Sequence, residues 1–199
     1  MRLAPLPGSA AWTHVDARAG YEVLFASPGR LRGQTTAVEA GVAWGVAYDI
    51  EVDADFNTRV VEASNLTING SRDIHLRKEA DDLWVVDGLH RPDLDGCSDV
   101  DFESSAVTNT LPLHRAHFTI NEPVDVASAY VRATDLRVER LEQTYTLTRT
   151  TEHGFIFWYE SPAFDFSCEL TVDHAGLVVD YPGIAKRDAC RCLVNACHF

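Results

Sequence analysis

Three acidic residues at alternate positions are the first feature of the chain that could carry chemistry. In the segment DVDFE, Asp99, Asp101 and Glu103 alternate with Val100 and Phe102. On a strand the three carboxylates share one face, where they could bind a hard cation or divide into a general acid and a general base. The alternative is a face in contact with water, or acids that cap the next turn. The acid-rich composition of the chain favours this alternative.

The next segment, TNTLP at 108–112, combines turn residues with a possible ligand contact. The short polar side chains of Thr108, Asn109 and Thr110 can bond nearby backbone groups, which predicts a turn. Pro112 favours an extended residue before it, which predicts the entrance to a strand at Arg115–Ile120. Alternatively, Asn109 and Arg115 present hydrogen bonds to a ligand head group, since Arg can grip a phosphate or carboxylate. Turn chemistry explains every residue except Arg115, so we favour the structural role.

Motifs for nucleophilic or cofactor chemistry are missing from the sequence. It contains no Gly-x-Ser-x-Gly elbow, P-loop, dinucleotide fingerprint or His-Glu-x-x-His motif, so no cofactor is expected. His114 and His117 are three residues apart, which places them on opposite faces of a strand and makes them poor partners for one metal ion.

The end of the chain carries a possible zinc site at Cys190, Cys192, Cys197 and His198. Thiolates with one imidazole suit zinc, but the spacing does not match a zinc knuckle. The segment IAKRDACRCLVNAC, at 184–197, could form a short helix. On this helix, Cys190 and Cys197 share an apolar stripe with the leucine and valine at 193 and 194, which favours a docked helix instead.

The charge balance excludes several classes of partner. The chain has 17 basic and 30 acidic residues and a net charge of −13, so neither nucleic acid nor an anionic membrane surface is an expected partner. No apolar run is long enough for a transmembrane span, and the N-terminal segment does not resemble a signal peptide. The five cysteines are an odd number, which suits a reducing compartment. We therefore expect a cytoplasmic protein; the sequence does not indicate its oligomeric state.

Alternation of apolar and polar residues dominates the elements that must position these side chains. In WGVAYDIEV the large residues Trp44, Val46, Tyr48 and Ile50 share one face, and AFDFSCELTVD at 163–173 alternates in the same way. Turn residues separate these strands from further candidates. The sequence predicts a mostly antiparallel β protein, with strands also at Tyr21–Ala26, Arg32–Glu39, Arg59–Ile68, Asp73–Arg77, Leu83–Val86, Val124–Val131, Glu142–Thr150, Gly154–Tyr159 and Gly176–Asp180.

The sequence predicts a duplication that organises the strands within a single domain, 1–199. The segment GVAWGVAYDIEVDADF, at 41–56, aligns with PVDVASAYVRATDLRV, at 123–138, through a shared Ala-Tyr pair. Cys97 and Cys168 lie in a second pair of similar segments. The predicted repeats are 12–103 and 104–183, followed by a tail at 184–199. Two such half-sheets would pack or roll together, which removes exposed sheet edges.

The segment DVDFESSAVTNTLPL with Arg115, followed by AYV, LEQTYT and VDHAGLVVDYPG, resembles the family of bacterial proteins described as "putative glycolipid-binding". The resemblance spans nearly the whole chain, apart from the tail. It implies an antiparallel spiral β-roll, or half-barrel, built from two repeats. It also implies a lipid- or glycolipid-binding role, which rests on analogy between folds.

Aromatic residues could line a binding pocket between the repeats. They share strands with a few polar anchors, as in a small-molecule site, and they could equally fill a closed core. The residues concerned are Tyr48, Tyr130, Gln143, Tyr145, Phe157, Tyr159 and Phe166.

Three functions remain open from the sequence. The first is a binding protein without catalytic activity that holds an amphipathic lipid or glycolipid. The second is an enzyme that acts on a small polar or sugar-like substrate through Asp99, Asp101 and Arg115. The third is an interaction module whose acidic surface meets a basic partner.

Overall fold

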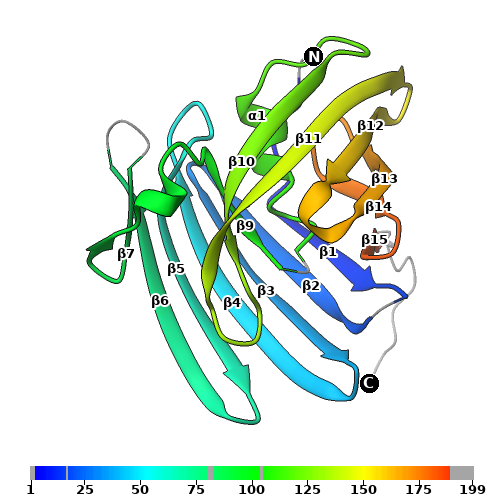
Figure 1. Ribbon diagram of the computed structural model, residues 1–199. Coiled ribbons are helices and arrows are strands. Elements are labelled where there is room, and N and C mark those ends of the chain that lie inside the picture. The colour runs from blue at the N-terminus through cyan, green and yellow to red at the C-terminus, as the bar shows by residue number, and fades with distance from the viewer. Residues whose placement is uncertain (1–2, 17, 80–82, 104, 189–199) are drawn as a thin grey trace.

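The chain folds into one continuous β-sheet (Figure 1). A computed structural model describes residues 3–16, 18–79, 83–103 and 105–188, and in these residues the sheet has 15 strands. The first eight strands are β1 (Ser9–His14), β2 (Arg18–Ser27), β3 (Arg30–Glu39), β4 (Val42–Val52), β5 (Thr58–Thr67), β6 (Gly70–Lys78), β7 (Trp84–Val86) and β8 (Leu89–His90). The others are β9 (Asp99–Phe102), β10 (Pro123–Val131), β11 (Val138–Thr151), β12 (Gly154–Ser161), β13 (Phe166–Val172), β14 (Val178–Tyr181) and β15 (Ala185–Arg187).

Two meanders meet in the middle of this sheet. The strand order is β8-β7-β6-β5-β4-β3-β2-β1-β15-β14-β13-β12-β11-β10-β9. Neighbouring strands are antiparallel except β9 and β10, which are parallel. The meanders join through β1 and β15, where Trp12 lies opposite Arg187 and His14 opposite Ala185. The prediction of a mostly antiparallel β protein is confirmed.

Only short helices occur in the described residues. They are α1 (Thr110–Arg115) and the 3-10 turns η2 (Pro92–Leu94) and η3 (Pro162–Phe164). The two repeats and the roll remain predictions. β9 falls within the first predicted repeat, yet it pairs with β10 of the second meander.

Strand alternation builds the core as the sequence predicts. Trp44, Val46, Tyr48 and Ile50 of β4 are all buried. Leu170 of β13 is buried with its neighbours on the same face. β9 also reaches the first meander, because the backbone N–H of Val100 donates to the Thr58 hydroxyl at 3.3 Å. The apolar faces of both meanders therefore contribute to one core.

The strand predicted at Arg115–Ile120 is wrong. Residues 110–115 form α1, and Ala116 closes it by donating its N–H to the Pro112 carbonyl at 2.9 Å. Pro112 is the third residue of this helix, where a backbone N–H has no partner within the helix, so proline is tolerated there. Burial of Leu111 and Leu113 stabilises the turn as a helix.

The predicted tail also begins differently. Residues 185–187 form β15, which fills the position between β1 and β14, so the predicted helix does not begin at Ile184. The rest of that predicted helix, with Cys190, Cys192, Cys197 and His198, lies outside the described residues.

Candidate functional site

A partly enclosed pocket lies where β9 and the second meander meet the start of β2. We call it the inner pocket; its volume is about 240 Å³. Its wall combines aromatic rings with carboxylate, amide, hydroxyl and guanidinium groups. The lining residues are Arg18, Asp101, Phe102, Glu103, Ser105, Asn109, Tyr130, Leu141, Tyr159, Ser161, Phe164, Phe166, Tyr181 and Ile184.

Asp101 of β9 places a carboxylate in this wall. Thr108 donates its hydroxyl to one carboxylate oxygen at 2.6 Å, and the Gln143 amide donates to the other at 2.8 Å. The same Gln143 nitrogen lies 2.8 Å from the Tyr159 hydroxyl, which links β9, β11 and β12. Burial raises the pKa of Asp101 to about 6, although both hydrogen bonds act to lower it. Asp101 can therefore exchange a proton near neutral pH.

A second carboxylate, Glu22 of β2, holds the loop that forms one side of the pocket. Glu22 is fully buried and accepts hydrogen bonds from the Ser105 hydroxyl at 2.5 Å and the Ala106 backbone N–H at 2.6 Å. The Tyr48 hydroxyl donates to it at 2.9 Å from two strands away. Tyr48 can reach this far because it passes over Gly33, where a Cβ would lie 2.3 Å from its hydroxyl oxygen. Burial raises the pKa of Glu22 to about 7.

Asn109 faces the pocket from the turn before α1. Its side chain does not cap the helix, and its carbonyl oxygen accepts a hydrogen bond from the Tyr145 hydroxyl at 2.8 Å. Asn109 and Tyr145 are both buried. This contact fixes the turn against β11, so Asn109 presents a defined edge to the pocket.

Arg115 is placed against Asp99. Its Nε and Nη2 donate to the two Asp99 carboxylate oxygens, with the shortest distance 2.8 Å. Asp99 is fully buried, whereas the Arg115 side chain is 20% exposed. The favoured interpretation of the alternating acids as a solvated face is therefore wrong for Asp99, which is fully buried. Asp101 and Glu103 are half-buried, and Asp101 accepts its hydrogen bond from Thr108 in the next loop, in line with the other form of that interpretation.

Aromatic rings form the apolar wall of the pocket. Tyr130 and Phe164 have ring centroids 5.5 Å apart, and the Arg132 guanidinium lies within 5.3 Å of both centroids. On the other side the Tyr159 ring meets Tyr181 edge to face. Such a wall packs against an apolar or sugar-like ring surface and leaves hydrogen-bonding groups at its margins.

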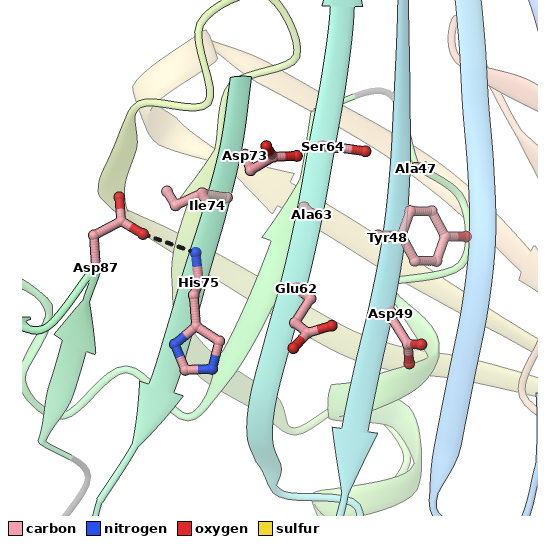
Figure 2. A pocket seen from close by; sticks show the side chains of 10 residues that line it. All are labelled: Ala47, Tyr48, Asp49, Glu62, Ala63, Ser64, Asp73, Ile74, His75 and Asp87. Carbon is pink, nitrogen blue, oxygen red and sulfur yellow. Dashed lines mark hydrogen bonds between the residues drawn. The ribbon is translucent and has the colours of Figure 1, made fainter. Parts of the chain in front are cut away.

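A larger hollow lies on the solvent side of β4, β5 and β6 (Figure 2). We call it the outer hollow; its volume is about 530 Å³. Asp49 and Glu62 lie opposite each other on adjacent strands, and the His75 backbone N–H donates to Asp87 at 2.9 Å. Asp49 is already paired with Arg30 at 2.7 Å. Despite its size the outer hollow is open and its acids face water, so the inner pocket is the better candidate site.

The inner pocket brings together part of the set predicted from the sequence. Asn109, Tyr130, Tyr159 and Phe166 line it, and Gln143 and Tyr145 support it through hydrogen bonds. Tyr48, Phe157 and Arg115 do not line it: Tyr48 acts through Glu22, and Phe157 is a fully buried core residue.

Sequence reasoning missed Arg18, Glu22 and Tyr181 of this site. Glu22 lies in the alternating segment YEVLF, where the pattern gives no sign that the acidic position faces inward. Tyr181, the tyrosine of DYPG, could have been recognised from the sequence, because a tyrosine in a strand with few other large residues is usually packed against the core.

The described residues contain no group of three or more His, Cys, Asp or Glu side chains placed to hold a metal ion. No helix among them is both long and apolar enough to cross a membrane.

Comparisons with known proteins agree with this description. Among curated proteins, no sequence matches the chain. A crystal structure of a DUF1089 family protein from Pseudomonas aeruginosa superimposes with a TM-score of 0.77 at 28% sequence identity, covering 94% of this chain and 100% of that one. The family model described as "Putative glycolipid-binding" matches residues 9–187. The chain therefore belongs to this family.

Proposed function

We propose that this protein binds an amphipathic lipid or glycolipid, with the polar part of the ligand in the inner pocket. The observation that carries the proposal is the composition of the pocket wall, in which aromatic rings stand beside Asp101, Asn109 and Tyr159. Carboxylate and amide oxygens accept hydrogen bonds from sugar hydroxyls, and tyrosine rings pack against the apolar face of a sugar. The name of the family supports the same class of ligand.

The size of the pocket limits what it can enclose. Its volume, about 240 Å³, is below the roughly 300–1,000 Å³ typical of sites that enclose a whole drug-sized ligand. We infer that the head group enters the pocket, whereas the alkyl chains lie outside it or require the pocket to widen. The spiral roll of two repeats belongs to this proposal, since it would place the pocket between them.

The test begins with the purified protein. Solvent extraction followed by mass spectrometry should recover a bound amphiphile, and octyl β-glucoside below its micelle concentration should raise the melting temperature. Phe164→Ala shortens the pocket wall at a half-exposed residue and should weaken binding. Trp158→Ala is the matched control, because Trp158 is exposed on the neighbouring strand outside the pocket. Equal loss in both variants, or no binding to a panel of amphiphiles, contradicts the proposal.

A second candidate function is an enzyme, and one observation favours it. Asp101 lines the pocket, and its pKa is raised to about 6 by burial, as a general acid or base near neutral pH requires. Arg115 and Asp99 pair with each other beside it, so they would hold β9 and α1 in place without touching a substrate. Turnover of a chromogenic glycoside or ester that disappears in Asp101→Asn would support an enzyme. Unchanged turnover in that variant would exclude Asp101 as the catalytic group.

We also propose a cytoplasmic location. Cys97 and Cys168 are free thiols in the core, and burial raises their pKa values to about 11 and about 12, which keeps both protonated and unreactive. Free thiols suit a reducing compartment. Cell fractionation with an antibody to the protein tests the location, and recovery outside the cytoplasm contradicts it.

A further inference from the structure

Arg18 brings a positive charge to the wall of the inner pocket, and only part of its guanidinium is paired. It is the first residue of β2, and its side chain is 11% exposed. Its Nη2 donates to Glu39 at 3.1 Å. Its Nε and Nη1 are buried, and neither has a hydrogen-bond partner in the part of the chain that the structure describes. A guanidinium stays charged at every physiological pH, so the wall of the pocket contains a permanent cation, and two of its nitrogen atoms have no partner among the described residues.

The pair with Glu39 does not explain this burial. The Glu39 side chain is 37% exposed, and an exposed ion pair contributes little to stability. Two buried donors without acceptors are unfavourable for the protein alone. A ligand oxygen next to Arg18 would satisfy them, and a charged oxygen would do so with a shorter and stronger hydrogen bond.

The same pocket holds acceptors within electrostatic reach of this cation. Tyr130 lies close enough to the acids and to Arg18 for both to change its hydroxyl pKa. Burial raises that pKa most, Glu103 and Asp101 raise it further, and Arg132 and Arg18 act to lower it. Glu103 is engaged by the Ala133 N–H at 2.8 Å and by Arg132. Asp101 accepts one hydrogen bond on each oxygen, so each oxygen can accept another.

We propose that the head group held in the inner pocket is acidic, with a carboxylate or phosphate bound by Arg18 and free hydroxyl groups directed toward Asp101. This inference rests on the proposed function and narrows its ligand class to acidic amphiphiles that also carry hydroxyls, such as an acidic glycolipid. Arg18 and Asp101 both line this pocket of about 240 Å³, so a single head group can contact both residues.

A matched pair of amphiphiles tests the charge. Octyl β-glucoside and octyl β-glucuronide share a chain and a ring and differ only at C6, which is a hydroxymethyl group in the first and a carboxylate in the second. Calorimetry on the full chain at pH 7.5, below both micelle concentrations, should show at least tenfold tighter binding of the glucuronide. Arg18→Met should reduce that preference to less than twofold, and Arg18→Lys should retain part of it. Arg32→Met is the control, because Arg32 is an exposed arginine of β3 outside the pocket.

The outcomes distinguish failure of the acidic head group from failure of the proposed binding function. Equal binding of the two amphiphiles overturns the acidic head group and leaves the binding function standing. A preference that survives in folded Arg18→Met, as checked by circular dichroism, overturns the role of Arg18. If neither amphiphile binds, the proposed function fails and this inference fails with it.

Two further measurements sharpen the assignment. Glu39→Gln removes the carboxylate that competes for Arg18, so it should tighten glucuronide binding by roughly threefold or more; weaker binding would count against the inference. Octyl phosphate and free glucuronate identify the source of the acid. Tight octyl phosphate binding indicates a phosphate head group, whereas binding of free glucuronate indicates that the sugar acid suffices without a chain.

Discussion

Carboxylates occur on both sides of this sheet, and their surroundings differ. On the inner side, Glu22 accepts three hydrogen bonds while fully buried. On the outer side, Glu62 and Asp73 stand in the outer hollow, exposed to water (Figure 2). Water solvates the outer acids at no cost, whereas each inner acid must replace water with protein donors. The number of acids at a place is therefore a poor guide to a site, and the burial of each acid is a better one.

The largest expected difference between the two sides follows from removing a whole carboxylate. Glu22→Ala leaves three buried donors without an acceptor: the hydroxyls of Ser105 and Tyr48 and the N–H of Ala106. We therefore expect a loss of about 3 kcal/mol in the free energy of unfolding. Glu62→Ala, the outer control, should cost less than about 0.5 kcal/mol. Urea denaturation monitored by tryptophan fluorescence measures both. Similar losses would mean that the inner hydrogen bonds do not matter more than solvation.

The second largest expected difference is between the ion pairs of the two sides, in the stability that is lost when the arginine is removed. Arg115→Met leaves the fully buried Asp99 without its guanidinium and should cost about 2 kcal/mol, less than for a wholly buried pair because Arg115 is partly exposed. Arg30→Met removes the partner of Asp49 on the outer side, where the arginine is 43% exposed, and should cost below about 1 kcal/mol. Thermal and urea unfolding compare the two variants. An equal cost would remove the distinction between the two pairs.

The raised pKa of Glu22 should make the stability of the protein depend on pH. Its pKa is raised from 4.5 to about 7 in the folded state, so the folded protein binds the proton more tightly than the unfolded chain. This contribution to stability is fully present below about pH 4.5 and is lost as the pH rises through 7. Between pH 5 and pH 7 it should fall by about 2 kcal/mol, using about 1.4 kcal/mol for each pKa unit.

Comparison with Glu22→Gln isolates this effect. Asp101 acts in the same direction as Glu22, while burial lowers the pKa values of His14 and His114, which act in the opposite direction. All three are common to both proteins, so the difference between their urea midpoints against pH belongs to Glu22. Parallel curves would contradict the assigned pKa.

The smallest expected difference concerns single hydroxyls. Tyr145→Phe removes the donor to Asn109 and leaves its buried carbonyl unpaired, which should cost about 1 kcal/mol. Tyr21→Phe changes an exposed residue of β2 on the outer side and should have almost no effect. The two melting temperatures provide the measurement, and a larger shift for Tyr21→Phe would reverse the expected order.

The sequence predicts the strands well because alternation reflects burial directly. β4 shows this: its large residues, from Trp44 to Ile50, are buried as their period of two requires. β2 shows the limit of the same rule. Tyr21, Val23 and Phe25 are its larger residues, yet they face solvent, while Glu22 and Leu24 are buried. The inward face of β2 is decided by partners far along the chain, such as Ser105, and a local pattern cannot show them.

The candidate site could be predicted only in part for the same reason. Tyr130, Asn109 and Tyr159 are recognisable as aromatic or polar residues on or beside predicted strands, and they do line the inner pocket. Arg18 enters the pocket because β2 lies near the seam between the two meanders. The helix at 110–115 could not be told from a strand entrance in the sequence, because Pro112 is compatible with both.

The pairing of β1 with β15 has a consequence for how the chain folds. Trp12 and Arg187 meet across almost the whole sequence, so the seam at the middle of the sheet closes a loop that contains most of the chain. Contacts of such long range slow folding, because the chain entropy is lost before the contact is gained. During synthesis β1 has no partner on this side until residue 187 has left the ribosome. We expect each meander to form early and the seam to form last, in the rate-limiting step of folding.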